Sequence, residues 1–263
     1  MIRALFSAAS GMNAQQLNVD NIAHNLANSN TTGFKESRTQ FQDLLYQHIV
    51  QPGTAAGSQT TVPTGLEVGL GVRPSSNEVV FTQGSFASTD NPLDLVIQGK
   101  GFFQIQMPTG DINYTRAGNF SLDRDGNIVT SDGNPLLPQI TIPPQAQDIN
   151  IALDGTVSYT VPGQTAAQKA GQILIATFPN PGGLSSVGSS LFTQTDSSGA
   201  PTVAPPGGQE GAGTLLQGYL EQSNVSIVDE FVNMIVAQRT YEANSKVVKT
   251  ADEMYQQVNN LVQ

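Results

Sequence analysis

The segment 226–263 carries a heptad repeat of apolar residues. One row recurs every seven residues and consists of Ile227, Met234, Tyr241, Val248, Tyr255 and Val262. Three further residues each follow a member of that row by three positions: Ala237, Ala251 and Val258. A seven-residue repeat predicts a left-handed coiled-coil seam rather than the flank of a compact domain. Because no Pro or Gly follows Val225, we expect one helix about 55 Å long.

The beginning of this helix carries two further signals. Ser226-Ile-Val-Asp229 fits a capping box, in which a hydroxyl and a carboxylate bind free backbone N–H groups. A second apolar row, confined to the first half, contains Val225, Val228, Val232 and Ile235. A helix that is apolar on two sides has more than one neighbour. Burial of the helix within its own domain is the alternative interpretation.

Residues 1 to about 30 predict a second helix with the same period. Its seam contains Leu5, Met12, Val19 and Leu26, and the adjoining line contains Ala9 and Ala23. The simplest partner for each terminal seam is the other one. An amide-rich face with Asn18, Asn21, Asn25 and Asn28 is either solvated or hydrogen-bonds neighbouring copies. Gly33 is placed for a left-handed C-terminal cap.

The composition excludes several classes of function. Net charge is −10, charged residues make up only 12% of the 263 residues, and the chain has no cysteine. We find no basic stripe, so nucleic acid is not an expected partner. No apolar run approaches the length of a membrane span. His24 and His48 have no ligand-spaced companions, and we expect no catalytic, cofactor-binding or metal-binding residues.

Between the two helical ends the sequence changes twice. Residues 47–71 are rich in turn chemistry without a strong period, which indicates a segment that is disordered or lies on another surface. From about 73 to 217, short alternating runs separated by turns predict β-structure. The clearest hairpin signal is Asp154-Gly155, with apolar residues alternating on both sides. We expect one more strand over 171–178, and mostly loop over 179–213 with Phe192 as an anchor.

This order of elements predicts an α+β protein. A discontinuous coiled-coil domain of N- and C-terminal helices contains an inserted, mainly antiparallel β domain of sandwich or barrel-like form. The expected boundaries are 1–45 for the N-terminal helix and following segment, 46–72 for an extended segment, 73–217 for the β-rich domain, and 218–263 for the C-terminal helix. The seams are thin, so we expect the terminal helices to fold stably only when other copies complete their burial.

Long motifs at both ends resemble the bacterial flagellar rod and hook proteins. The N-terminal motifs are Ser10-Gly-Met-Asn-Ala-Gln-Gln16, Asp20-Asn-Ile-Ala-His-Asn-Leu-Ala-Asn28 and Asn30-Thr-Thr-Gly-Phe-Lys35. The C-terminal motifs are Glu221-Gln-Ser-Asn-Val225, Val232-Asn-Met-Ile and Gln238-Arg-Thr-Tyr-Glu242. The middle of the chain matches the same family through Asn91-Pro-Leu-Asp-Leu-Val-Ile-Gln-Gly-Lys-Gly-Phe-Phe103 and Tyr114-Thr-Arg-Ala-Gly-Asn-Phe120.

Within this family, the segment from Tyr46 to Arg73 resembles the extra segment of distal rod proteins. The resemblance implies a structural subunit of a self-assembling hollow drive shaft, located in the periplasmic basal body and exported without a cleaved signal peptide. The implied partners are further copies in a helical tube, proximal rod proteins, the hook protein, the outer bushing rings and the flagellar export apparatus. We expect the 47–71 segment to stiffen the tube, through Gln51, Pro52, Gly53, Pro63 and Gly65.

Two alternatives remain at this stage. A proximal rod or hook protein of the same family would share most of these motifs. A cell-wall hydrolase would need two carboxylates across a cleft, but the Asp-Gly pairs fall at predicted turns, where Asp bonds locally. Asp123-Arg-Asp-Gly-Asn127 lacks the closing Glu of a calcium loop and also predicts a turn.

Overall fold

In the computed structural model of the protein, which describes residues 2–53, 64–162, 166–208 and 211–261, the chain forms two compact units. The helical unit comprises Met1–Ala27, Ser37–Glu78 and Ser226–Gln263. The β unit comprises Asn28–Glu36 and Val79–Val225. The β unit therefore extends beyond the predicted 73–217 at its C-terminal side and takes in the segment that follows the first helix.

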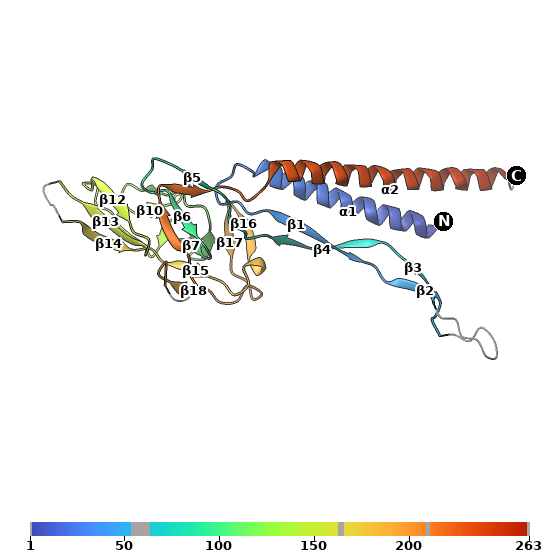
Figure 1. Ribbon diagram of the computed structural model, residues 1–263, viewed down its shortest axis with the longest axis horizontal. Coiled ribbons are helices and arrows are strands. Elements are labelled where there is room, and N and C mark those ends of the chain that lie inside the picture. The colour runs from blue at the N-terminus through green and yellow to red at the C-terminus, as the bar shows by residue number, and fades with distance from the viewer. Residues whose placement is uncertain (1, 54–63, 163–165, 209–210, 262–263) are drawn as a thin grey trace. The chain divides into compact units, whose positions relative to one another are not determined.

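Two long helices run side by side in the helical unit (Figure 1). Helix α1 spans Ile2–Ala27 and helix α2 spans Ile227–Leu261. Ser226 caps α2 as expected, because its hydroxyl accepts the Asp229 N–H at 3.4 Å. Helix α1 ends earlier than expected, six residues before Gly33. Gly33 does have a left-handed φ of 69°, but this conformation does not cap α1. It allows a close backbone contact within the β unit.

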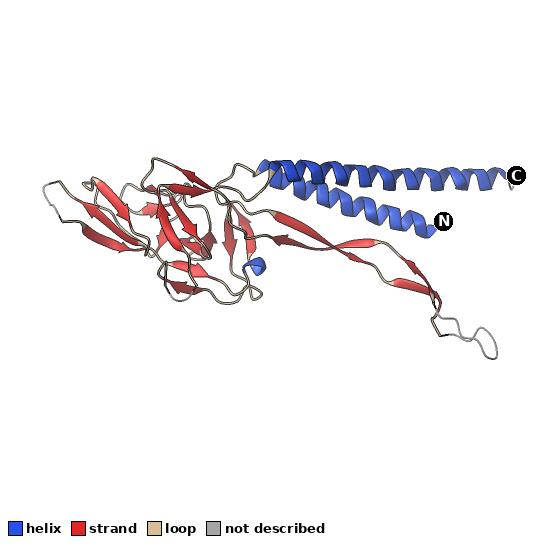
Figure 2. Ribbon diagram, viewed as in Figure 1, coloured by secondary structure: helices blue, strands red, loops and turns tan. Residues whose placement is uncertain are grey.

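A long two-stranded ribbon completes the helical unit (Figure 2). Strand β1 (Ser37–Asp43) pairs with β4 (Val72–Val79), and β2 (Tyr46–Val50) pairs with β3 (Leu66–Gly69). Of the two alternatives given for 47–71, the disordered one is therefore wrong for β2 and β3. These strands are short and mostly exposed on both sides, so they lack the alternation that normally identifies a strand. Residues 54–63 lie outside the described residues.

The β unit is antiparallel wherever its named strands pair. Its largest sheet has the order β16-β17-β8-β7-β15-β18, with β11 also pairing with β7. The strands of that sheet are β7 (Phe102–Gln106), β8 (Ile112–Thr115), β11 (Leu136–Leu137), β15 (Ile175–Thr177), β16 (Ser185–Gly188), β17 (Leu191–Thr193) and β18 (Thr202–Ala204).

Smaller sheets surround this one. A three-stranded sheet contains β12 (Asp148–Ile151), β13 (Thr156–Thr160) and β14 (Gln168–Gln172). Three strand pairs join β5 (Phe86–Ser88) to β20 (Tyr219–Glu221), β6 (Leu95–Gln98) to β19 (Thr214–Gln217), and β9 (Ser121–Leu122) to β10 (Ile128–Val129). A 3-10 helix covers Pro181–Gly183. The predicted α+β class, with helical ends around an antiparallel insertion, is confirmed.

The hairpin predicted at Asp154-Gly155 is present between β12 and β13. The Thr156 N–H donates to Asp154 Oδ1 at 3.0 Å, and this bond lowers the pKa of the Asp154 carboxyl. Gly155 adopts a φ of 80°, as the turn requires. Asp123 likewise begins a turn, because its carbonyl accepts the Gly126 N–H at 2.9 Å. Local chemistry was therefore a sound guide to these turns.

One prediction in the β unit is wrong, and another omitted three short strands. The segment 171–178 is not one strand, because β14 ends at Gln172 and pairs with β13, whereas β15 begins at Ile175 and pairs with β7. The segment 179–213 lies mostly outside the named strands, as predicted, but it also holds the three short strands β16, β17 and β18. Strands β16 and β17 form a hairpin, and β16 and β18 are the two edges of the large sheet. These strands are too short to show an apolar run in the sequence. Phe192 does anchor this region, with 5% of its surface exposed.

Strand β7 is covered on both faces, so its first four side chains are all buried instead of alternating between buried and exposed. One face packs into an aliphatic core around Phe103 and Ile105, and Phe103 meets Phe120 edge to face at 5.1 Å. The other face packs Phe102 into an aromatic cluster with Phe178 and Phe192. These two cores fix the β unit on which the buried junction described below depends.

Candidate assembly site

The two helices meet along a narrow seam of α2. Its members are Met234, Ala237, Tyr241, Asn244, Val248, Ala251 and Tyr255, alternately three and four residues apart; we call this the inner seam of α2. Ala237 and Ala251 are almost fully buried, at 2% and 3% exposure. Asn244 lies directly against Gly11, where an added Cβ would come within 2.8 Å of its amide nitrogen. The contact line of α2 thus follows its heptad repeat.

The structure places the other proposed seam residues unevenly. Ile227 is 44% exposed and Val258 is 47% exposed, and Val262 lies outside the described residues. In α1, Leu5, Met12, Val19 and Leu26 are half-buried, whereas Ala9 and Ala23 are exposed. The fully buried residues of α1 are Ala8, Ala14, Ile22 and Asn25. Alanines occur on several sides of α1, so the sequence does not indicate which side faces α2. Because Ala9 and Ala23 are exposed, they remain candidates only for contacts with other copies.

The predicted amide face makes hydrogen bonds within the chain. Asn25 is buried, and its Nδ2 donates to Glu230 Oε1 and to the Ser37 carbonyl, both at 2.8 Å. Asn21 Nδ2 donates to Thr39 Oγ1 at 3.0 Å. Asn25 therefore links α1 to both α2 and β1 instead of meeting another copy.

The outer two members of that face differ from one another. Asn28 belongs to the β unit, and its Oδ1 accepts the Thr31 hydroxyl at 3.1 Å. Asn18 is half-buried. An inter-subunit role for these amides stays a prediction, and the buried position of Asn25 argues against it there.

Large apolar side chains are exposed over much of the helical unit. On the first half of α2 they are Val228, Phe231, Val232, Ile235 and Val236, each at least half exposed. On the ribbon, Leu45 is 85% exposed, and Ile49 and Leu66 are more than half exposed. Exposed patches of this extent mark interaction surfaces in soluble proteins. The second apolar row predicted for α2 therefore lacks a partner within the described chain.

Four of the proposed stiffening residues, Gln51, Pro52, Gly53 and Gly65, lie at the far end of the ribbon. Gly65 stands so close to Val50 and Pro52 that an added Cβ would come within 2.7 Å of both. Gly53 has a φ of 84° and nothing within 4 Å of its Cβ position. Gln51 follows β2 directly, and Pro63 lies outside the described residues. Their stiffening role stays a prediction.

A buried ionic junction lies in the β unit and was missed by the sequence analysis. It consists of Lys35, Arg116 and Glu221. Lys35 Nζ lies 2.6 Å from Glu221 Oε1, and Arg116 Nη1 lies 3.5 Å from Glu221 Oε2. The side chains of Lys35 and Glu221 are completely buried, and that of Arg116 is 5% exposed. One carboxylate thus serves two cations in the protein interior.

Backbone groups bond several of the remaining polar atoms of the junction, whereas Arg116 Nε is buried without a hydrogen-bond partner among the described residues. Lys35 Nζ donates to the Thr82 carbonyl at 2.7 Å, and Arg116 Nη2 donates to the Gly99 carbonyl at 2.7 Å. The Gly84 N–H donates to Glu221 Oε1 at 3.0 Å. Burial lowers the pKa of the Lys35 ammonium, and the Glu221 carboxylate opposes that effect. Removal of Glu221 would leave two buried cations with carbonyl partners only.

The junction closes the two ends of the β unit onto each other. The Gly33 N–H donates to the Glu221 carbonyl at 2.8 Å, and the Glu36 N–H donates to Asn224 Oδ1 at 2.7 Å. Gly33 is also pressed against the backbone of Ala117, where a Cβ would lie 2.4 Å from the nitrogen. Its left-handed φ thus serves a close backbone approach. The segments that directly follow α1 and directly precede α2 are therefore fastened together.

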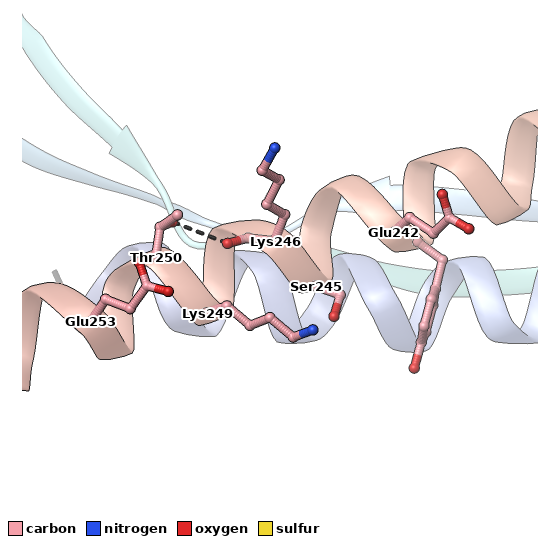
Figure 3. Close-up of a pocket in the computed structure, with 7 residues that line it drawn as sticks. Glu242, Ser245, Lys246, Lys249, Thr250 and Glu253 are labelled. Atoms are coloured by element: carbon pink, nitrogen blue, oxygen red, sulfur yellow. Dashed lines mark hydrogen bonds between the residues drawn. The ribbon is translucent and has the colours of Figure 1, made fainter.

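Figure 3 shows an open hollow along one side of α2, lined by Tyr241, Glu242, Ser245, Lys246, Lys249, Thr250 and Glu253. Among the described residues, no group of three or more His, Asp or Glu side chains could hold a metal ion. A search of the same residues found no helix that is long and apolar enough to cross a membrane.

Comparison of the sequence with known protein families identifies the class of protein that has these terminal helices and this antiparallel insertion. Residues 5–35 match the family described as flagella basal body rod protein. Residues 96–159 match the flagellar hook protein FlgE/F/G D1 domain, and residues 216–261 match the flagellar basal body rod FlgEFG protein C-terminal region. The chain is thus a member of the flagellar rod and hook class of structural proteins.

Full-length relatives narrow this class to one family. The flagellar basal-body rod protein FlgG of Caulobacter vibrioides is 51% identical over 99% of this chain and 99% of its own length. The proteins of the same name from Buchnera aphidicola subsp. Schizaphis graminum and Bacillus subtilis are 47% and 43% identical, each over 99% of this chain and 100% and 99% of their own lengths. The chain belongs to the flagellar basal-body rod protein FlgG family.

Proposed function

We propose that the chain is the structural subunit of the flagellar distal rod and self-assembles into a hollow, rigid shaft that transmits torque to the hook. The observation that carries this mechanism is the set of large apolar side chains left exposed on α2. In a tube of many copies, these side chains would be buried between helices, and each buried apolar group would favour assembly. Torque would then pass from helix to helix.

The proposal also covers location and partners. The shaft would stand in the periplasmic part of the basal body, between the proximal rod proteins and the hook protein. It would pass through the outer bushing rings, and its subunits would be delivered by the flagellar export apparatus. The proposal includes no catalytic step. Asp154, which belongs to one of the Asp-Gly pairs weighed for the hydrolase alternative, serves a turn.

Assembly-coupled folding of the helices provides the test. We expect far-UV circular dichroism of the dilute full-length chain to report mainly β-structure, with helical signal appearing when the protein polymerises. The reason is that α1 and α2 together bury few large side chains in one chain, and helices are marginal without tertiary packing. Electron microscopy of the same samples should show tubes. A dilute monomer with full helical signal, or concentrated protein that forms no tubes, would contradict the proposal.

A second prediction concerns the ribbon. The Leu44 N–H donates to the Gly71 carbonyl at 2.9 Å, so residues 45–70 can be replaced by an Asn-Gly turn that closes β1 onto β4. We expect the shortened chain to form tubes with a shorter persistence length than the unaltered chain, because the exposed apolar side chains of β2 and β3 would no longer brace neighbouring copies. Persistence length is measured from electron micrographs. Equal stiffness of the two tubes would refute a bracing role.

A further inference from the structure

Helix α2 carries a second heptad row, beside its inner seam. The row consists of Val236, Thr240, Ala243, Val247, Thr250 and Met254, which follow one another at intervals of four and three residues. We call it the outer row of α2. All six residues are exposed, including Val236 at 58%, Val247 at 44% and Met254 at 47%. Alternating intervals of three and four are the spacing that packs a helix against a second helix.

The hydroxyls of the two threonines in the outer row are already hydrogen-bonded within α2, so these residues can be covered by an apolar neighbour. Thr240 Oγ1 donates to the Val236 carbonyl at 2.8 Å. Thr250 Oγ1 donates to the Lys246 carbonyl (Figure 3) and to the Val247 carbonyl, both at 3.0 Å. A helix packed over these positions would leave neither hydroxyl without a hydrogen bond, so the usual cost of covering a polar group does not arise. The outer row thus behaves as an apolar seam throughout.

The outer row lies about a third of a turn around α2 from the inner seam, at about 100° per residue. Helix α2 can therefore hold α1 of its own chain on one side and another helix on the adjacent side. Helix α1 presents a row with matching spacing. Its members are Phe6, Ala9, Asn13, Gln16, Asp20, Ala23 and Ala27, all exposed; we call this the outer row of α1.

Charge and size favour these two rows as partners. The outer row of α1 carries one charge, at Asp20. The outer row of α2 is flanked by three cations and two carboxylates, which leaves a net positive charge beside it: Arg239, Lys246, Lys249, Glu242 and Glu253. Ala9 and Ala23 leave room for the larger Val247 and Met254. Contact between two different surfaces also continues from copy to copy, whereas contact of one surface with itself stops at a dimer.

We propose that the outer row of α2 packs against the outer row of α1 of a second copy of this chain. This inference rests on the proposed function, because it assigns one of the contacts that build the tube. It gives Ala9 and Ala23 a partner that they lack within their own chain. Each helix pair is thereby continued sideways into the next pair.

Disulfide trapping tests which helix occupies the outer row. The chain contains no cysteine, so the only thiols are those introduced. Chains carrying Val247→Cys are mixed with chains carrying Ala9→Cys, Asn13→Cys or Ala23→Cys, assembled, and oxidised. We expect a disulfide-linked pair of unlike chains with at least one α1 variant, and none in dilute solution. Gln238→Cys, also exposed on α2 but outside the outer row, should give none with the same α1 variants. Linkage only between two Val247→Cys chains would overturn the proposal.

A substitution separates this inference from the proposed function. Val247→Glu should raise the critical concentration for polymerisation at least about tenfold, because it places a carboxylate in an apolar seam. The matched control Gln238→Glu adds the same charge outside the row and should leave the critical concentration within about twofold of the unaltered chain. If Val247→Glu polymerises like Gln238→Glu, the outer-row contact is wrong while the rod function stands. If the unaltered chain forms no tubes, both fail.

Discussion

Replacing Glu221 by glutamine should lower the free energy of unfolding of the β unit by about 3–5 kcal/mol. Glutamine keeps the shape and one acceptor oxygen of glutamate, so the Gly84 N–H can still be bonded. It removes the only carboxylate that serves Lys35 and Arg116, which are buried beside it. Breaking a buried ion pair from one side leaves an uncompensated charge in the interior, and that is the origin of the large cost.

Differential scanning calorimetry of the dilute full-length chain measures this effect. For a unit of this size, about 3–5 kcal/mol corresponds to a fall of about 6–20 °C in the melting temperature. Glu67→Gln provides the matched control. Glu67 Oε1 lies 3.0 Å from His48 Nδ1, but both side chains are about half exposed, so its loss should cost less than about 1 kcal/mol. Equal melting temperatures for the two variants would refute a stabilising role of the junction.

A double-mutant cycle adds a second check on the same junction. Lys35→Met removes one of the two cations, so the double variant Lys35→Met with Glu221→Gln should be less destabilised than the sum of the single variants. The expected coupling is about 1–3 kcal/mol, which is typical of residues in one buried network. Additive effects would mean that Lys35 and Glu221 do not depend on one another, contrary to the 2.6 Å contact between them.

Local signals in the sequence were sufficient for the helices and the tight turns. The burial of Ala237 and Ala251 follows directly from their place in the heptad repeat. The hairpin at Asp154-Gly155 depends on a bond from Thr156 to the preceding aspartate and on a glycine with positive φ. Each of these features is determined within about seven residues of chain, so it can be read without knowledge of the fold.

The buried junction could not be found in this way, although all of its residues lie in motifs noted in the sequence. Lys35 and Glu221 are 186 residues apart, and Arg116 is 105 residues from Glu221. Only the fold brings them together. A usable signal was their charge, because charged residues make up only 12% of this chain and buried charges are normally paired. That signal indicates a partner without indicating which one.

The partners of the amide residues on α1 could not be predicted from the local sequence either. The amide row around Asn25 has the spacing of a solvated or interacting face, and nothing local shows that Ser37 and Glu230 close over it. Asn25 bonds both through contacts of 2.8 Å. The inner seam of α2 contains Asn244 as well as alanines, and Glu230 contacts Asn25 of α1 one heptad before Ala237, so an apolar pattern alone omits both residues.

Gly33→Ala should destabilise the β unit by about 2–5 kcal/mol, the second large effect we expect. Two costs combine at this position. A left-handed φ of 69° costs alanine about 1–2 kcal/mol. Its Cβ would also come within 2.4 Å of the Ala117 backbone nitrogen and within 2.7 Å of the Arg116 carbonyl carbon. Backbone atoms cannot turn aside as a side chain would, so this overpacking adds about 1–3 kcal/mol.

Gly133→Ala separates the two costs. Gly133 has a comparable φ of 82° and lies in the same unit, but nothing lies within 4 Å of its Cβ position. The Gly133→Ala substitution should therefore lower the free energy of unfolding by only about 1–2 kcal/mol, which is the backbone cost alone. Thermal unfolding of the two dilute full-length variants gives the comparison. If both melt at the same temperature, the approach of Gly33 to Ala117 carries no energetic weight. A lower melting temperature for Gly33→Ala would show that the segment after α1 is held by contact with Arg116 and Ala117, which directly follow β8. The two ends of the β unit would then be fastened by packing as well as by charge.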